Sequence, residues 1–480
     1  MNSLLSSFFL LLLLVFVCGL HAADEKPPPN FVVIFCDDLG YGDLACFGHP
    51  TIHTPHLDRM AAQGQKWTNF YVAACVCTPS RAALITGRYP IRSGMCSDKR
   101  RVLFPDSKGG LPASEKTIAE VLKKKGYATA AVGKWHLGHL PQYLPTSHGF
   151  DSYFGIPYSN DMDRVKDAPR GKDSFWKPKV EYWNVPLLRN EKEEERPANQ
   201  HTVTRRFGEE GVKFINQNAG KKPFFLYLPF TAPHFPAQSH PDWKGKSANG
   251  AYGDVVEELD GRVGEILETL KDTKLDKKTI VVFLSDNGPE PGQKKWANAE
   301  PYRGLKWSAL EGGTRVPCIA RLPGVIPAGG ESDKLTTAID FLPTLAHACG
   351  INLSKVSKGV PKIDGVNVWD TLTGKSDRHP RTHLLYWQGW AVPQAIRVGD
   401  WKLYLDKLKE IPGSDKGPVL VDLSKDPTEQ SNLSEQHPDK VKEMKALADK
   451  LLAEIEKNAL SLGGPPNTRK SSPKRGHWLK

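Results

Sequence analysis

Long apolar runs, rich in β-branched and aromatic residues, recur along the first two thirds of this chain. Unbroken runs of this kind predict strands that are buried on both faces of a sheet. They lie at residues 30–36, 127–132, 223–228 and 279–284. Between them, apolar residues recur at the spacing of amphipathic helices, at residues 116–125, 202–218 and 255–270. This alternation predicts an α/β fold with a large, mostly parallel mixed sheet flanked by helices.

The pattern changes near residues 374–381. Beyond them, apolar and polar residues alternate in short segments, as in antiparallel strands, and a long amphipathic helix follows. The strand-like segments are residues 384–387, 394–398, 401–405 and 419–423, and the helix covers residues 441–459. We therefore expect a main domain over residues 24–375 and a smaller C-terminal α+β domain with an antiparallel sheet over residues 376–462. Within the main domain, residues 167–197 are charged and irregular, which predicts a surface insertion.

The N-terminal residues 4–20 are apolar and are followed by small residues before Asp24. This is typical of a secretory signal peptide, here over residues 1–23. A retained anchor and a lipoprotein signal at Cys18 are the alternatives. The run is at the short limit for crossing a bilayer, and Val17 is not the small residue that lipoprotein processing needs. We expect export to a periplasmic, secreted or lysosome-like compartment, without stable membrane insertion.

The net charge of +11 is concentrated in part at the C-terminal end. Residues 463–480 form a basic tail that we expect to be disordered and solvated, so the charge does not indicate a nucleic-acid partner; affinity for polyanions is the alternative. Eight cysteines are present, and seven remain once Cys18 has left with the signal peptide. Because seven is an odd number, at least one cysteine has no partner within the chain, and Cys77 is our candidate.

Oxygen-bearing side chains follow two of the predicted buried strands. Asp37 and Asp38 come directly after the first, and Asp286 and Asn287 after the last. The carboxyl ends of parallel strands lie at one edge of a sheet, where open α/β folds bind ligands. Adjacent buried carboxylates need a positive charge nearby, and an all-oxygen set suits Ca²⁺ or Mg²⁺ better than zinc. A turn capped by Asp38 is the alternative for the first pair.

The segment Cys77-Thr78-Pro79-Ser80-Arg81 has the features of a helix start. Proline is tolerated in the first helical turn, and Thr78 or Ser80 is a candidate cap. A cysteine at a helix N-terminus beside Arg81 lies in positive potential, which favours a thiolate or a bound anion. A capped helix with a half-buried cysteine is the alternative.

Lysine and histidine side chains follow the remaining predicted strands. Lys134 and His136 come after residues 127–132 and, being two apart in extended chain, are expected to point to one side. His234 follows the strand at residues 223–228, and Lys306 lies beyond the last strand. A lysine beside a histidine suits an anion site; a loop lysine and a packed histidine are the alternative.

Together, these segments resemble the type I sulfatase family. Residues 77–81 look like its C-x-P-S-R signature, residues 126–136 look like its second signature, and residues 155–161 resemble the arylsulfatase A and N-acetylgalactosamine-6-sulfatase branch. The resemblance implies an alkaline-phosphatase-like fold and hydrolysis of a sulfated glycan or aryl sulfate. It also implies that a formylglycine-generating or sulfatase-maturating enzyme converts Cys77 to Cα-formylglycine.

The resemblance also implies roles for single residues. Its metal ion is Ca²⁺, with Mg²⁺ less favoured, and the implied ligands are Asp37, Asp38, Cys77, Asp286 and Asn287. One hydroxyl of the hydrated formylglycine attacks sulfur, and the second lets the aldehyde re-form and expel sulfate. His234 donates a proton to the leaving alcohol and His136 accepts one. The implied catalytic residues are Cys77, Arg81, Lys134, His136, His234 and Lys306. The implied substrate-binding residues are Ser159, Lys134, His234 and Lys306.

Two other functions fit parts of the pattern. A phosphatase or phosphonate hydrolase of the same superfamily usually holds two zinc ions through several histidines, whereas the ligand set here is Asp and Asn. A non-catalytic protein that binds sulfated glycans through an unmodified Cys77 would use the same basic residues.

Overall fold

The computed structural model describes residues 28–97, 100–169, 172–353, 361–405, 411 and 417–460. The predicted signal peptide (residues 1–23) and the predicted tail (residues 463–480) lie outside the described residues. Within them, no helix has both the length and the apolar composition that a membrane crossing requires. Among the described residues, Cys77 forms no disulfide, as predicted, and neither do Cys36, Cys46, Cys75, Cys318 and Cys349.

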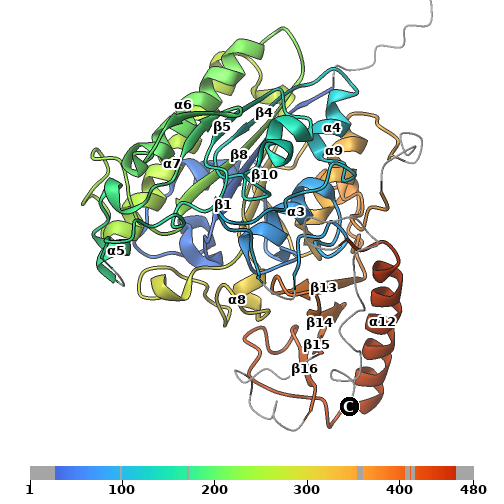
Figure 1. Ribbon diagram of the computed structural model, residues 1–480. Helices are drawn as coiled ribbons and strands as arrows, with labels where there is room; N and C mark the ends of the chain where they lie inside the picture. The colour runs from blue at the N-terminus through green and yellow to red at the C-terminus, as the bar shows by residue number, and fades with distance from the viewer. Residues whose placement is uncertain are drawn as a thin grey trace, which may run out of the picture.

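A ten-stranded mixed sheet forms the centre of the molecule (Figure 1). β9, β1, β8, β4 and β5 run parallel, and antiparallel strands flank them. This confirms the predicted large, mostly parallel sheet. From one edge to the other, the strands are β11 (Gly330–Ser332), β2 (Gln65–Trp67), β10 (Cys318–Arg321), β9 (Thr279–Ser285), β1 (Asn30–Asp37), β8 (Phe224–Pro233), β4 (Ala128–Val132), β5 (Ser152–Gly155), β6 (Leu187–Arg189) and β7 (Lys192–Glu195).

Helices cover both faces of this sheet, as Figure 1 shows. Side chains alternate between the two faces of a strand, so Val33 of β1 packs into one core and Ile34 into the other. Burying one such side chain fully contributes about 1.5–3 kcal/mol. The core with Val33 includes α3 (Cys77–Thr86), α4 (Ile118–Lys123), α9 (Phe341–Ala348) and α11 (Trp369–Leu372). The core with Ile34 includes α2 (Pro55–Ala62), α5 (Lys172–Trp176), α6 (Gln200–Asn218) and α7 (Gly250–Asp272).

A second, antiparallel four-stranded sheet lies below the main sheet in Figure 1, with one long helix beside it. This confirms the predicted smaller α+β part, while the boundary between residues 375 and 376 stays a prediction. Its elements are β13 (His383–Trp387), β14 (Pro393–Val398), β15 (Trp401–Tyr404), β16 (Val419–Asp422) and α12 (Pro438–Glu456).

The short strands were harder to predict than the central ones. Residues 167–197, expected to be irregular, contain β6 and β7, and β10 and β11 follow no clear apolar pattern. A two-stranded sheet also forms from β3 (Phe70–Tyr71) and β12 (Thr336–Thr337). These elements are short and pair at or near sheet edges, so long-range pairing and not local pattern determines them.

Candidate active site

The predicted oxygen ligands meet at the carboxyl ends of β1 and β9. Cys36 of β1 pairs in register with Ser285 of β9, so the residues that follow lie at one level. The N–H of Asp286 donates to the carbonyl of Cys36 (3.0 Å), and the N–H of Asp38 donates to Asp286 Oδ1 (3.2 Å). Asp38 has a φ of +65°, a conformation that is uncommon outside glycine and here turns the chain at the sheet edge.

Four side chains bring possible metal ligands together at this edge. One ligand atom from each of Asp37, Asp38, Cys77 and His234 lies within 4.8 Å of the others, and all four residues are buried. Nδ2 of Asn287 donates to Asp38 Oδ1 (2.6 Å), which places the amide beside this group. Oδ1 of Asn287 is buried without a hydrogen-bond partner in the structure. A buried carbonyl oxygen without a donor suits a cation.

Each of the three carboxylates has its own positively charged partner. Nζ of Lys134 donates to Asp37 Oδ2 (2.5 Å), and Nζ of Lys306 donates to Asp38 Oδ2 (2.8 Å). Arg81 donates to Asp286 Oδ2 through Nη2 (2.8 Å) and Nε (3.0 Å). These groups are buried, so the pairs offset the cost of removing the charges from water.

The pKa values of two of these carboxyls move in opposite directions. Burial raises the pKa of Asp37, but the charges of Lys134, His234 and Arg81 outweigh it and hold that pKa well below its ordinary value. Burial and the negative charge of Asp37 raise the pKa of Asp286 to about 7, although Arg81 opposes the shift. The protein's own cations therefore compensate for burial at Asp37 but not fully at Asp286.

Cys77 is the first residue of α3 and points at the acidic cluster. Its Sγ donates to Asp37 Oδ1 (3.4 Å). Burial and Asp37 raise the pKa of the Cys77 thiol well above its ordinary value, so the thiolate considered from the sequence is disfavoured. Burial and the neighbouring carboxylate outweigh the positive charges of Lys134 and Lys306, which favour the thiolate.

The predicted cap of α3 is wrong. The N-cap residue is the extended Val76, without a side-chain cap. Thr78 Oγ1 instead donates to the carbonyl of His136 (3.0 Å) and accepts from the N–H of Leu103 (3.1 Å). The Oγ of Ser80 is buried without a partner. Thr78 thus connects the helix start to the segment that carries His136.

Lys134 and His136 do not point to the same side, contrary to the expectation for extended chain. His136 has a φ of +59° and turns away, with Nε2 2.8 Å from the carbonyl of Leu103. Nδ1 of His136 is buried without a partner in the structure. Burial and the charge of Lys134 hold the pKa of His136 well below its ordinary value, so the ring is neutral. A neutral ring that donates from Nε2 keeps a lone pair on Nδ1.

The segment that begins at Gly133 fits closely between β8 and β5. Gly133 has a φ of +131°, and a Cβ there would lie 1.9 Å from the carbonyl oxygen of Pro229. Only glycine allows this approach. It places Lys134 where Nζ also donates to Ser159 Oγ (3.0 Å). Ser159 is therefore next to the cluster, as the resemblance implied.

His234 and Lys306 contact the cluster through Asp38. Nε2 of His234 lies 3.4 Å from Asp38 Oδ2, and its Nδ1 is 2.8 Å from the carbonyl of Phe235. Nζ of Lys306 also lies 3.5 Å from Oε2 of Glu290, a half-buried neighbour that sequence analysis missed. The Glu290 carboxylate follows Asp286-Asn287 by only a few residues, and that short separation was the available signal.

The C-terminal sheet holds the segment that carries Lys306. Lys402 of β15 is fully buried, and its Nζ donates to the carbonyl of Ala309 (2.7 Å) and to Glu311 Oε1 (2.8 Å). Glu311 begins the short helix α8 (Glu311–Thr314), and its N–H donates to Glu429 Oε2 (2.7 Å). These contacts connect the smaller sheet to the site.

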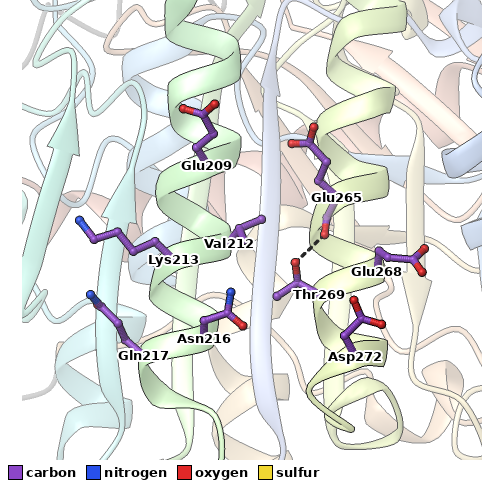
Figure 2. Close-up of a pocket in the computed structure, with 9 residues that line it drawn as sticks. All are labelled: Glu209, Val212, Lys213, Asn216, Gln217, Glu265, Glu268, Thr269 and Asp272. Carbon is purple, nitrogen blue, oxygen red and sulfur yellow. Dashed lines mark hydrogen bonds between the residues drawn. The ribbon is translucent and has the colours of Figure 1, made fainter.

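A separate hollow lies between α6 and α7 (Figure 2). It is an open groove of about 830 Å³, and most of the residues that line it are charged or polar and exposed. Its lining residues are Glu209, Val212, Lys213, Asn216, Gln217, Glu265, Glu268, Thr269 and Asp272. None of the predicted site residues is among them. The convergence of buried charges, and not the size of a hollow, therefore locates the candidate site at the sheet edge.

The chain is similar in sequence to known sulfatases. The family model described as Sulfatase matches residues 29–351. Human arylsulfatase A is 37% identical over 454 residues, covering 88% of this chain and 86% of that protein. Mouse N-acetylgalactosamine-6-sulfatase is 39% identical over 412 residues, covering 82% of this chain and 75% of that protein.

Solved structures show the same fold. The PsFucS1 sulfatase from Pseudoalteromonas sp. superposes with a TM-score of 0.79 at 27% identity, covering 92% of each chain. The protein Ps i-CgsB, solved in complex with k-i-k-neocarrahexaose, superposes with a TM-score of 0.73 at 30% identity, covering 92% of this chain and 95% of that chain.

Proposed function

The chain belongs to the sulfatase family and is a sulfuric ester hydrolase, and we propose that it removes sulfate from a sulfated carbohydrate by means of a formylglycine made from Cys77 and one Ca²⁺ ion. The observation that carries the proposal is the buried group of Asp37, Asp38 and Cys77, to which Asp286 and Asn287 are connected by hydrogen bonds with Asp38. The carbonyl oxygen of Asn287 has no hydrogen-bond partner there. The relatives named N-acetylgalactosamine-6-sulfatase and the complex of Ps i-CgsB with k-i-k-neocarrahexaose support a carbohydrate substrate.

Asp37, Asp38, Asp286 and Asn287 would hold the cation, together with the modified side chain of residue 77. Hard oxygen ligands of this kind favour Ca²⁺. When bound, the cation would polarise a sulfate oxygen, and the hydrated formylglycine would supply one hydroxyl as the nucleophile. Its second hydroxyl would allow sulfate to be released.

The surrounding residues orient the sulfate group and move protons. Lys134 and Lys306 place ammonium groups beside it and offset its negative charge, and Ser159 orients Lys134 and contacts the substrate. His234 donates the proton that the leaving alcohol needs. His136 accepts a proton on Nδ1, because its Nε2 is held by the carbonyl of Leu103. Arg81 acts through Asp286, whose carboxylate it holds in place.

The maturation partner must reach Cys77 before the chain is folded. Cys77 is 2% exposed and Arg81 is fully buried. An enzyme that modifies Cys77 needs this side chain and its neighbours to be accessible. We therefore propose that the formylglycine is made on the unfolded, exported chain.

Sulfate esters are expected to be hydrolysed far faster than phosphate esters with the same leaving group. Among the described residues, the group of ligand atoms at the sheet edge contains one histidine, which suits one hard cation and not a two-zinc centre. Rates on 4-nitrophenyl sulfate and 4-nitrophenyl phosphate test this directly. A large preference for the phosphate would instead support the phosphatase alternative. A sulfate-release screen over defined sulfated glycans then identifies the carbohydrate.

Removal of divalent ions with a chelator is expected to abolish sulfate release, and Ca²⁺ is expected to restore it better than Mg²⁺. Because a bound ion stabilises only the folded state, Ca²⁺ should also raise the thermal midpoint of the chelated enzyme. An Asn287→Leu variant should lose most of this Ca²⁺-dependent shift. Full activity and an unchanged midpoint in verified metal-free enzyme would exclude the proposed ion.

A further inference from the structure

The cationic side chain of Arg101 lies beside the proposed site but has no role in the reaction described above. The guanidinium carbon of Arg101 lies over the indole rings of Trp307 and Trp390, at 5.1 and 4.8 Å from their centroids. We call these three residues the Arg101 cluster. Each of them is half-buried, so the cluster reaches the protein surface.

The Arg101 cluster is connected to the residues of the proposed site. Leu103, two positions after Arg101, contacts both Thr78 Oγ1 and His136 Nε2. Trp307 directly follows Lys306, and its N–H donates to the carbonyl of Cys75 (3.2 Å). Nζ of Lys306 lies 5.3 Å from the centroid of the same Trp307 ring. One indole therefore contacts both the lysine proposed to bind sulfate and Arg101.

The smaller C-terminal sheet supplies the third member. Trp390 lies in the connection between β13 and β14, after Gly389, which has a φ of +83°. A Cβ at Gly389 would lie 2.7 Å from the carbonyl oxygen of Arg101 and 2.9 Å from Cγ2 of Val76, the residue before Cys77. The connection is thus packed directly on the start of α3.

Arg101 has cation–π contacts but, among the residues that the structure describes, no anionic partner. Within the described part of the chain, no carboxylate forms an ion pair with it and no acceptor takes a hydrogen bond from its guanidinium. Burial lowers its pKa from the ordinary value, whereas the neighbouring Arg100 has its pKa raised by a hydrogen bond to Asp106. Aromatic rings interact with the faces of a guanidinium, and its five N–H donors lie in the plane. Those donors match a carboxylate or a sulfate group.

We propose that the Arg101 cluster is an anion-binding subsite, and that the natural substrate carries a second anionic group, a carboxylate or a second sulfate, near the sulfate ester that is hydrolysed. The inference rests on the proposed function, because it places this second group on the same substrate. Arg101 is then a specificity-determining residue. Of its two aromatic neighbours, Trp307 belongs to the segment that carries Lys306 and Trp390 belongs to the C-terminal sheet region.

Three disaccharides test the inference. The reference carries one 6-sulfate on N-acetylgalactosamine beside a neutral galactose; the second has an additional 4-sulfate on the same ring, and the third has glucuronic acid in place of galactose. We expect the wild-type kcat/KM to be higher on at least one anionic analogue by roughly 10- to 100-fold, the range of a hydrogen bond to a charged group. In Arg101→Gln this ratio should fall to near one. The analogue whose preference is lost identifies the anion as sulfate or carboxylate.

A matched control lies one residue away. Arg100 is exposed and donates to Asp106 (2.9 Å), so Arg100→Gln removes a similar charge and should keep the wild-type ratio. Arg101→Lys keeps the positive charge but lacks the planar guanidinium, so it should retain part of the preference for the anionic analogue. This variant provides the test if Arg101→Gln does not fold. The same ratio in wild type and in a folded Arg101→Gln, or no preference in wild type, would overturn the inference. If neither 4-nitrophenyl sulfate nor any of the three disaccharides is hydrolysed, the proposed function itself fails.

Discussion

A Cys77→Ser variant is expected to lose turnover by a factor on the order of 10⁴ or more, as enzymes do when their nucleophile is removed. A serine has one hydroxyl, so a sulfated serine has no second hydroxyl to expel the sulfate. The variant should therefore accumulate a sulfated serine, which mass spectrometry of the residue 77 peptide detects. In the wild-type enzyme the same peptide should carry an aldehyde or its hydrate in place of the thiol.

Cys75→Ser provides the control for this substitution. Cys75 is buried two residues before Cys77, but its Sγ contacts the carbonyl of Trp387 (3.6 Å) and not the acidic cluster. A serine can keep that hydrogen bond, so turnover should stay near the wild-type rate. Wild-type activity in Cys77→Ser, or an intact thiol at full occupancy in active enzyme, would remove the formylglycine from the mechanism.

Replacing Arg81 by lysine is expected to lower the free energy of unfolding by about 3–5 kcal/mol, the usual cost of breaking a buried charge pair. A lysine cannot donate to Asp286 through two nitrogens while also reaching the carbonyl of Lys134, as Arg81 does (2.9 Å to the carbonyl). Because Asp286 is a proposed Ca²⁺ ligand, the affinity for Ca²⁺ should fall about 10- to 100-fold. Urea denaturation and Ca²⁺ titration of sulfate release measure the two effects.

Arg88→Lys separates stability from site chemistry. Arg88 is also buried and forms an ion pair with Glu115, away from the acidic cluster. Its replacement should reduce stability without changing the Ca²⁺ dependence of the rate. Equal Ca²⁺ affinity in Arg81→Lys and the wild-type enzyme would mean that Arg81 does not position a metal ligand.

The smaller C-terminal sheet contributes to the site in two separate ways. Lys402 holds the segment that carries Lys306 through Ala309 and Glu311, and the β13–β14 connection brings Trp390 to Arg101. The first contact is structural and the second concerns the substrate. The alternating pattern of residues 384–423 predicted this sheet, but it contained no information on which face of the main domain the sheet would contact.

The local pattern of the sequence was sufficient for the central sheet and for the place of the site. Continuous apolar runs predict buried parallel strands, and the polar residues that follow such strands must share one sheet edge. For this reason Asp37, Asp38, Asp286 and Asn287 were expected to meet, and the structure brings them together. The same reasoning placed Lys134, His234 and Lys306 nearby.

Only the tertiary structure decided how these residues are paired and oriented. Arg81 was expected among the catalytic residues, and the structure shows that it holds Asp286. His136 was expected to point to the same side as Lys134, yet a positive φ turns it toward Leu103, and the expected Thr78 or Ser80 cap is absent from α3. The Arg101 cluster joins residues from three distant parts of the chain. A local pattern reports which residues are apolar or polar at a given spacing. Pairing between residues hundreds of positions apart depends on how whole layers pack, because side-chain contacts and buried charges are satisfied only in the folded molecule.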